Sequence, residues 1–139
     1  MYTLKTEAAF DSAHFLSGYE GKCSNIHGHR WRVVAEIYSD KLVESGQERG
    51  MLVDFSHFKH VLKSEAEELD HALIIEKDSL PEALFNMLKD INFRIITLDF
   101  RPTAENLAEY LFNRLSGRGF RVKEVSVYET PNNCATYSQ

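Results

Sequence analysis

Apolar and polar residues alternate in several stretches of the chain, as they do in strands that bury one face. In residues 2–15 one face carries Ala8, Phe10, Ser12 and His14. In residues 26–38 the apolar face is formed by Trp31, Val33, Ala35 and Ile37. Residues 93–100, 122–130 and 134–137 have shorter patterns of the same kind. The sequence therefore predicts five strands.

Three other stretches repeat apolar residues at steps of three and four, which predicts helices. The first begins after Asp54, a residue suited to an N-cap, and carries an apolar stripe of Phe55, Phe58, Leu62, Ala66 and Leu69. The second has the capping-box pair Ser79 and Glu82, with Pro81 in its first turn. The third is capped by Thr103 and ends at Gly117 or Gly119.

The order of these elements predicts the fold class. Strands separated by helices, each strand with one polar face, are typical of an α+β domain whose helices pack on one face of a single antiparallel sheet. No repeat, linker or block of like charge divides the sequence, so residues 1–139 are expected to form one domain.

Composition narrows the possible functions. The 16 basic and 21 acidic residues leave a net charge of -5, which disfavours nucleic acid as a partner. Two cysteines do not make the disulfide framework of a small secreted domain. No apolar run approaches the ~20 residues of a membrane span, and the N-terminus lacks a signal-like apolar stretch. We therefore expect a cytoplasmic protein without a membrane partner.

Three of the six histidines lie between residues 14 and 29. His27 and His29 share one face of a strand, on either side of Gly28, and His14 ends the preceding strand. A single histidine is more often a hydrogen-bonded residue than a metal ligand. Three converging imidazoles, however, suit zinc and leave its fourth position open. The sequence therefore predicts a metal site at His14, His27 and His29.

The two cysteines have different expectations. Cys23, four residues before His27, either completes a structural zinc site or stays off the metal as a thiolate of lowered pKa, and sequence alone does not decide between them. Cys134 is expected to be an inert buried thiol. His57 and His60 fall on a predicted helix without a partner at ligand spacing, so both are expected to be surface residues.

Two further sets of residues have the chemistry of a site. In Asp70-His71 the carboxylate can orient the imidazole for proton transfer, although helix capping would explain the pair equally. Glu129 lies near the end of a strand, where its carboxylate is either solvated or accepts two parallel N–H bonds from a heterocyclic amine and ring nitrogen.

Six motifs together resemble the 6-pyruvoyl-tetrahydropterin synthase family. They occur in the family's order and span nearly the whole chain. They are FDSAH at 10–14, CSNIHGH at 23–29, GMLVDF at 50–55, LDH at 69–71, PTAEN at 102–106 and YET at 128–130. The three residues between Cys23 and His27 are similar to the bacterial 6-carboxy-5,6,7,8-tetrahydropterin synthase branch, because the animal enzymes usually have a longer gap.

The resemblance implies a role for each motif residue. The zinc ligands would be His14, His27 and His29. The proton-transfer residues would be Cys23, Asp70 and His71. The pterin would be anchored by Glu129, with Thr103, Ala104 and Glu105 at the neighbouring wall. The implied architecture is the tunnelling fold, in which sheets of several subunits, usually six, close into a barrel with active sites at the interfaces.

The implied activity is that of a lyase. Zinc-dependent conversion of 7,8-dihydroneopterin triphosphate would give 6-carboxy-5,6,7,8-tetrahydropterin, acetaldehyde and triphosphate, as in queuosine biosynthesis. Mg²⁺ would accompany the triphosphate, with Lys22 and Arg30 as candidate contacts. The alternatives are a 6-pyruvoyl product, a related aldol cleavage, and a non-catalytic zinc or pterin-binding module.

The sequence departs from the family pattern at two places. Ala104 replaces a frequent threonine, and the stretch from Leu73 to Arg101 is longer than in many bacterial members.

Overall fold

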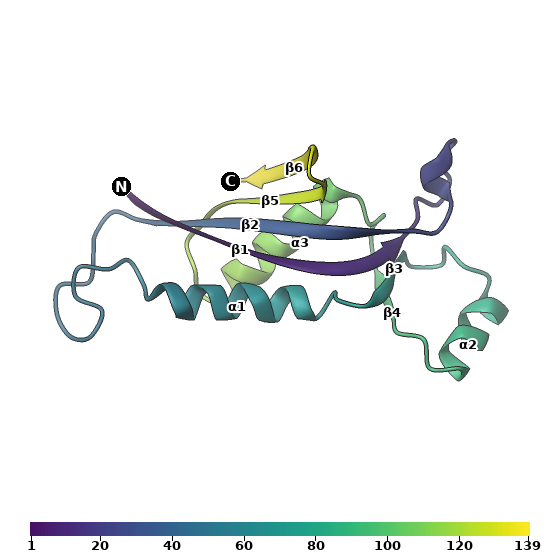
Figure 1. The fold of residues 1–139 in the computed structure, drawn as a ribbon, viewed down its shortest axis with the longest axis horizontal. Coiled ribbons are helices and arrows are strands. Elements are labelled where there is room, and N and C mark those ends of the chain that lie inside the picture. Colours follow the sequence, from purple (N-terminus) through teal and green to yellow (C-terminus); the bar gives the residue numbers. More distant parts are fainter.

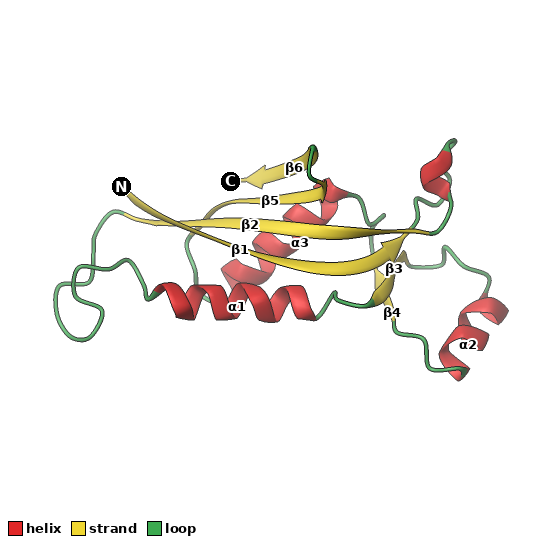
Figure 2. Cartoon of the chain, in the orientation of Figure 1, coloured by secondary structure: helices red, strands yellow, loops and turns green.

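A computed structural model describes all of residues 1–139 as a six-stranded sheet with three α-helices (Figures 1 and 2). The strands are β1 (Tyr2–His14), β2 (His27–Ser39), β3 (Ala72–Glu76), β4 (Ile95–Leu98), β5 (Val122–Thr130) and β6 (Asn133–Ser138). The helices are α1 (Phe55–Glu67), α2 (Glu82–Asp90) and α3 (Ala104–Gly117), and a short 3-10 helix covers Lys22–Ser24. None of the helices combines the length and apolar character needed to cross a bilayer.

The sheet has the strand order β4-β3-β1-β2-β5-β6. Helix α1 packs on β1, and α3 packs on β5 and β6, so both helices cover the same face (Figure 1). Helix α2 projects away from the sheet beyond β3 and β4 (Figure 2). The predicted α+β class, with helices on one face of the sheet, is confirmed.

The sheet is not antiparallel throughout. β1, β2, β5 and β6 pair antiparallel, whereas β3 joins β1, and β4 joins β3, in parallel. The sequence did not predict β3, because its five residues form a short apolar run without alternation. The connection through α2 allows the parallel pairing of β3 with β4, which a hairpin could not provide.

The core lies between the sheet and the two covering helices. The apolar face predicted for β2 is buried. Phe58, Leu62 and Ala66 of α1 are also buried, as is Leu69 in the turn that follows the helix. Phe55, the first residue of that predicted stripe, is instead 68% exposed. Helical phase correctly groups Phe55 with the other four residues, but phase does not reveal that no element covers the first turn.

Two of the three predicted helix caps are present. Asp54 accepts a hydrogen bond from the Ser56 N–H at 2.7 Å, and Thr103 accepts one from the Asn106 N–H at 3.2 Å. The prediction of a capping box at Ser79 is wrong. The Ser79 hydroxyl donates instead to the Glu76 carbonyl at 2.6 Å, and α2 begins after Pro81 without a side-chain cap.

The buried and exposed phenylalanines of α1 make a matched pair for testing this core. Phe58→Ala should lower the free energy of unfolding by about 3–5 kcal/mol, because it leaves a cavity among buried side chains. Phe55→Ala removes an exposed ring and should change stability by no more than about 0.5 kcal/mol. Chemical denaturation followed by circular dichroism measures both, and equal losses would contradict this packing.

Candidate functional site

The three histidines converge because of how β1 pairs with β2. Their antiparallel register sets His14 opposite His27 and Ser12 opposite His29. The imidazole nitrogens Nε2 of His14 and His27 lie 3.1 Å apart. A Glu129 oxygen joins them, and all four side chains place one donor atom within 4.8 Å of the others. The predicted histidine cluster is therefore assembled within one chain.

Main-chain carbonyls fix the protonation of two of these rings. His14 Nδ1 lies 2.7 Å from the Pro102 carbonyl oxygen, and His27 Nδ1 lies 2.6 Å from that of Asn25. A carbonyl oxygen only accepts, so each Nδ1 donates a proton and each neutral ring has a lone pair at Nε2. Two lone pairs 3.1 Å apart repel each other unless a cation lies between them. This arrangement fits a metal centre.

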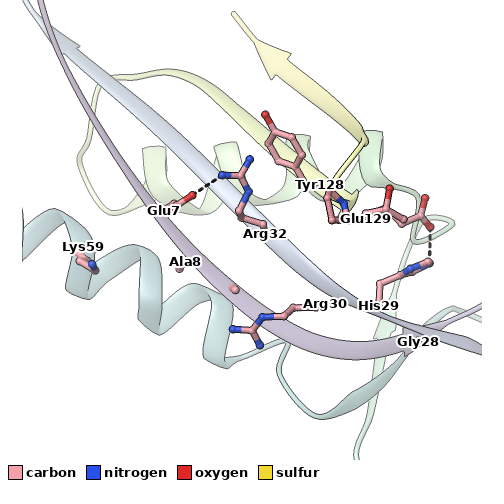
Figure 3. A pocket seen from close by; sticks show the side chains of 12 residues that line it. Glu7, Ala8, Gly28, His29, Arg30, Arg32, Lys59, Tyr128 and Glu129 are labelled. Atoms are coloured by element: carbon pink, nitrogen blue, oxygen red, sulfur yellow. Dashed lines mark hydrogen bonds and ion pairs between the residues drawn. The ribbon is translucent and has the colours of Figure 1, made fainter.

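Glu129 is the fourth side chain of this cluster. Its Oε1 atom lies 3.1 Å from His14 Nε2. The same atom lies 2.9 Å from His29 Nε2 (Figure 3). The His29 contact lacks the angles of a hydrogen bond, and His29 Nε2 is a buried polar atom without a hydrogen-bond partner. A buried imidazole nitrogen in this state is suited to coordinate a metal. Imidazole and carboxylate donors are those that zinc accepts.

Burial keeps the cluster in its metal-binding form. Desolvation is the largest effect on His14 and lowers its pKa, although its bond to Pro102 and the charge of Glu129 oppose this. Desolvation likewise lowers the pKa of His29, again against the charge of Glu129. Neutral imidazole is the form that coordinates a metal, so both shifts favour binding near neutral pH.

Cys23 lies beside this cluster but is not one of its four donors. It lines a pocket of about 360 Å³ that also borders His14, Glu129 and the predicted wall residues Thr103, Ala104 and Glu105. The fold thus gathers the predicted pterin-binding residues around one cavity. Cys134 lines the same pocket and is exposed, so the expectation of a buried thiol is wrong. It lies in β6, the last strand of the sheet.

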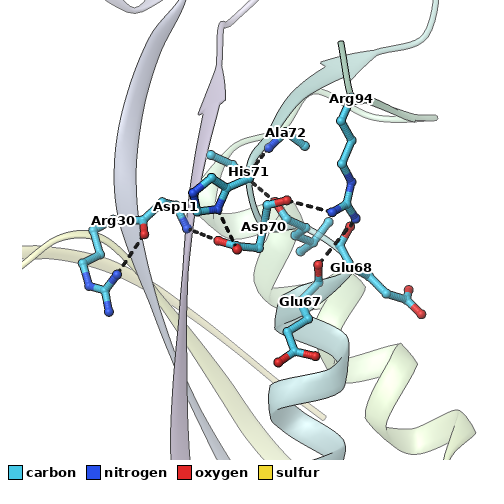
Figure 4. Close-up of polar contacts among 10 residues, drawn as sticks. Asp11, Arg30, Glu67, Glu68, Asp70, His71, Ala72 and Arg94 are labelled. Atoms are coloured by element: carbon cyan, nitrogen blue, oxygen red, sulfur yellow. Dashed lines mark hydrogen bonds and ion pairs between the residues drawn. The ribbon is translucent and has the colours of Figure 1, made fainter. Parts of the chain in front are cut away.

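Asp70 and His71 form a hydrogen-bonded pair at the end of α1 (Figure 4). His71 Nδ1 lies 2.7 Å from Asp70 Oδ2, and Asp70 Oδ1 accepts the Asp11 N–H at 2.8 Å. The Asp11 N–H, and after it the His71 side chain, lowers the pKa of Asp70. The carboxylate therefore stays ionised and orients the imidazole, whose Nε2 is left to exchange a proton.

His71 and Cys23 line different pockets. His71 borders a cavity of about 680 Å³ that includes Gly28, His29 and Arg30, whereas Cys23 borders the smaller cavity at His14. Within one chain, Asp70 and His71 therefore lie together, whereas Cys23 borders another cavity.

Several basic residues lie near the cluster or on the surface. The largest cavity, about 840 Å³, includes Arg30, Arg32 and Lys59 next to His29 and Glu129 (Figure 3). Arg30 is paired with Asp11 at 2.9 Å. His57, His60 and Lys22 are exposed, as expected of the two histidines.

Sequence reasoning missed the groups that orient the site, because most are main-chain atoms. The carbonyls of Asn25 and Pro102 and both main-chain polar groups of Asp11 act whatever their side chains are. Only the position of Asp11, Asn25 and Pro102 inside the quoted motifs could have indicated them.

Comparison with known proteins relates this site to a family. A family model described as 6-pyruvoyl tetrahydropterin synthase matches residues 3–139. A 6-carboxy-5,6,7,8-tetrahydropterin synthase of Haemophilus influenzae is 36% identical over 110 residues, which are 78% of this chain and 77% of the relative. One from Aquifex aeolicus is 37% identical over 92 residues, covering 63% of this chain and 52% of the relative.

Solved structures share the fold. An uncharacterized protein from Wolinella succinogenes superposes with a TM-score of 0.83 at 23% identity, covering 99% of this chain and 98% of that one. A Plasmodium vivax 6-pyruvoyltetrahydropterin synthase superposes with a TM-score of 0.71 at 20% identity, covering 99% and 97%.

Metal content distinguishes the two roles left open for Cys23. His27→Ala should abolish stoichiometric metal binding, because it removes one of three converging imidazoles. Cys23→Ala should retain the metal, since its sulfur lies outside the donor set. Elemental analysis of purified, folded protein measures both. Loss of metal from Cys23→Ala would instead make the thiolate a ligand and favour a structural zinc module.

Proposed function

Because the chain belongs to the 6-pyruvoyl tetrahydropterin synthase family, we propose that it is a zinc-dependent lyase acting on 7,8-dihydroneopterin triphosphate. The products are 6-carboxy-5,6,7,8-tetrahydropterin, acetaldehyde and triphosphate, a step of queuosine biosynthesis. The observation that carries the proposal is the convergence of three imidazole side chains beside a pocket lined by a free thiol. In two of these rings Nδ1 donates to a main-chain carbonyl, which leaves Nε2 without a proton. Relatives named for this reaction, 36% and 37% identical, support the choice of product.

His14, His27 and His29 would hold the zinc. Once bound, zinc acts as a Lewis acid that acidifies protons beside the oxygens it binds. The chain's own contribution is to keep these imidazoles neutral and oriented. The Pro102 and Asn25 carbonyls fix two rings, and burial disfavours the protonated form of His14 and His29.

Proton transfer is assigned to Cys23 and His71. Asp70 accepts a hydrogen bond from the Nδ1–H group of His71. The opposite ring nitrogen, Nε2, therefore takes or returns a proton on one side of the substrate side chain. The Cys23 thiol serves the other side. A residue pair that acts on both sides avoids moving one group around the substrate during the reaction.

Pterin recognition is assigned to the 360 Å³ pocket at Cys23. The carboxylate of Glu129 accepts the amino and ring N–H groups of the pterin, as a planar pair of acceptors can. Thr103, Ala104 and Glu105 form the adjacent wall, where Ala104 offers only main-chain contacts. Mg²⁺ accompanies the triphosphate. Arg30 is a candidate for contacting the triphosphate oxygens.

Assembly into a hexamer is part of the proposal. Cys23 and His71 of one chain line separate pockets, so a complete site requires His71 from a neighbouring copy or a rearrangement. The sheet also ends in β4 and β6, whose outer edges are unpaired. Unpaired edges are normally covered or joined to another strand. Interfaces between copies would satisfy both needs.

His71 offers a direct test of the reaction. His71→Ala should lower kcat with dihydroneopterin triphosphate about 10²- to 10⁴-fold, the usual contribution of a general acid or base, while metal content stays unchanged. His60→Ala, on the exposed face of α1, is the matched histidine control and should leave kcat as in the wild type. Chromatography of the pterin product with an acetaldehyde assay measures the reaction.

The products decide between the alternatives. A pyruvoyl product without acetaldehyde would replace the 6-carboxy assignment by the 6-pyruvoyl one. No turnover in the wild-type protein with bound metal would favour a binding module.

A substitution at Glu129 tests the assignment of the pterin pocket. Glu129→Ala should retain the metal on three histidines and raise KM at least about tenfold, because an anchor for two N–H groups is lost. Elemental analysis and steady-state kinetics measure the two effects. Loss of the metal in this variant would identify Glu129 as a fourth ligand, a role that its 2.9 Å contact with His29 Nε2 also permits.

A further inference from the structure

The turn that carries His71 has an unusual backbone. His71 adopts a φ of 51°, in the left-handed region where glycine is the usual residue after a helix. A side chain in this conformation costs about 1 kcal/mol or more, so neighbouring contacts must hold it. One such contact is the His71 N–H, which donates to the Asp11 carbonyl at 2.7 Å.

A second set of contacts comes from Arg94, which lies in the long stretch between Leu73 and Arg101. Its Nη1 donates to the Asp70 carbonyl at 2.9 Å and its Nη2 to the Glu68 carbonyl at 2.5 Å, with a longer contact of 3.4 Å to Glu67 (Figure 4). Its own carbonyl accepts the Leu73 N–H at 3.0 Å. Arg94 thus contacts the chain on both sides of His71.

The two carbonyls that Arg94 contacts most closely lie at and just beyond the end of α1. The last carbonyls of a helix have no intrahelical donor, and a cation placed there also interacts favourably with the helix dipole. The guanidinium is a rigid planar fork, so it holds two carbonyls in a fixed relation. For α1 these two carbonyls belong to Glu68, its C-cap residue, and to Asp70, which lies in the turn immediately before His71.

The anchoring of α1 itself does not depend on Arg94. Other arginines tie this helix to α3, since Arg114 and Arg118 of that region bond the buried carboxylate of Glu65 at 2.7 and 2.8 Å. Phe58 and Leu62 of α1 belong to the buried core, whereas Arg94 is exposed. The contacts of Arg94 therefore concentrate on the segment that carries the acid–base pair.

We propose that Arg94 is a positioning residue for the Asp70–His71 pair. Its guanidinium holds the carbonyls before the left-handed turn, and the turn aims the His71 ring at the Asp70 carboxylate and into the 680 Å³ cavity. The inference rests on the proposed role of His71 in proton transfer. It gives the Leu73–Arg101 stretch a part in the site, although that stretch contributes no metal ligand.

The test uses the full-length, metal-loaded protein and three variants. Arg94→Ala should leave metal content and KM unchanged and lower kcat about tenfold or more, as expected when a catalytic group is misplaced. Arg94→Lys, which can reach one carbonyl, should recover part of this loss. Arg121→Ala is the matched control, because this exposed arginine bonds Asp40 at the other end of β2.

A second measurement does not depend on turnover. Amide hydrogen exchange at His71 and Asp11, whose N–H groups bond across the turn, should become about tenfold faster in Arg94→Ala and stay unchanged in Arg121→Ala. Unchanged exchange at both amides would overturn the inference, whatever the activity. Adding Arg94→Ala to His71→Ala should lower kcat no further, and an additional tenfold loss there would also overturn it.

The same set separates this inference from the proposed function. If His71→Ala keeps full activity, the proposed role of His71 fails, even where exchange shows that Arg94 holds the turn.

Discussion

The pairing of β1 with β2 is the constraint on which the rest of the site depends. Thirteen residues of each strand pair in one register, and the last pair joins His14 to His27. Side chains alternate between the two faces, so a slip of one residue would turn the histidines away from one another. The buried face of Trp31 and its neighbours resists such a slip, because it would expose the core. Hydrophobic packing along the strand pair thus sets the metal-binding geometry at its end, where the Trp31 ring lies 4.8 Å from that of His14.

Sequence alone predicted the parts of the site that depend on side-chain identity and strand period. Alternation placed His27 and His29 on one face and His14 at the end of the preceding strand, and the structure brings the three together with Glu129. What it did not predict depends on main-chain atoms. No residue type indicates that the Pro102 carbonyl will meet His14, since that contact joins residues 88 positions apart.

The incorrect expectations have a common physical origin. Phe55 has the right helical phase, and Ser79 has the right spacing from Glu82, but each depends on what surrounds it in three dimensions. The first turn of α1 has no covering element, and the Ser79 hydroxyl finds a nearer acceptor at Glu76. Cys134 was expected inside because free thiols usually are, yet it lies on the edge strand of the sheet. Local pattern is informative about the element and less so about its neighbours.

Asp11 holds Asp70 and His71 through its own N–H and carbonyl, three residues before a predicted metal ligand on the same strand. Those two groups are common to nineteen of the twenty amino acids, proline being the exception because it has no N–H. The bonds to Asp70 and His71 would therefore survive a change of side chain at position 11, which would break only the ion pair of Asp11 with Arg30.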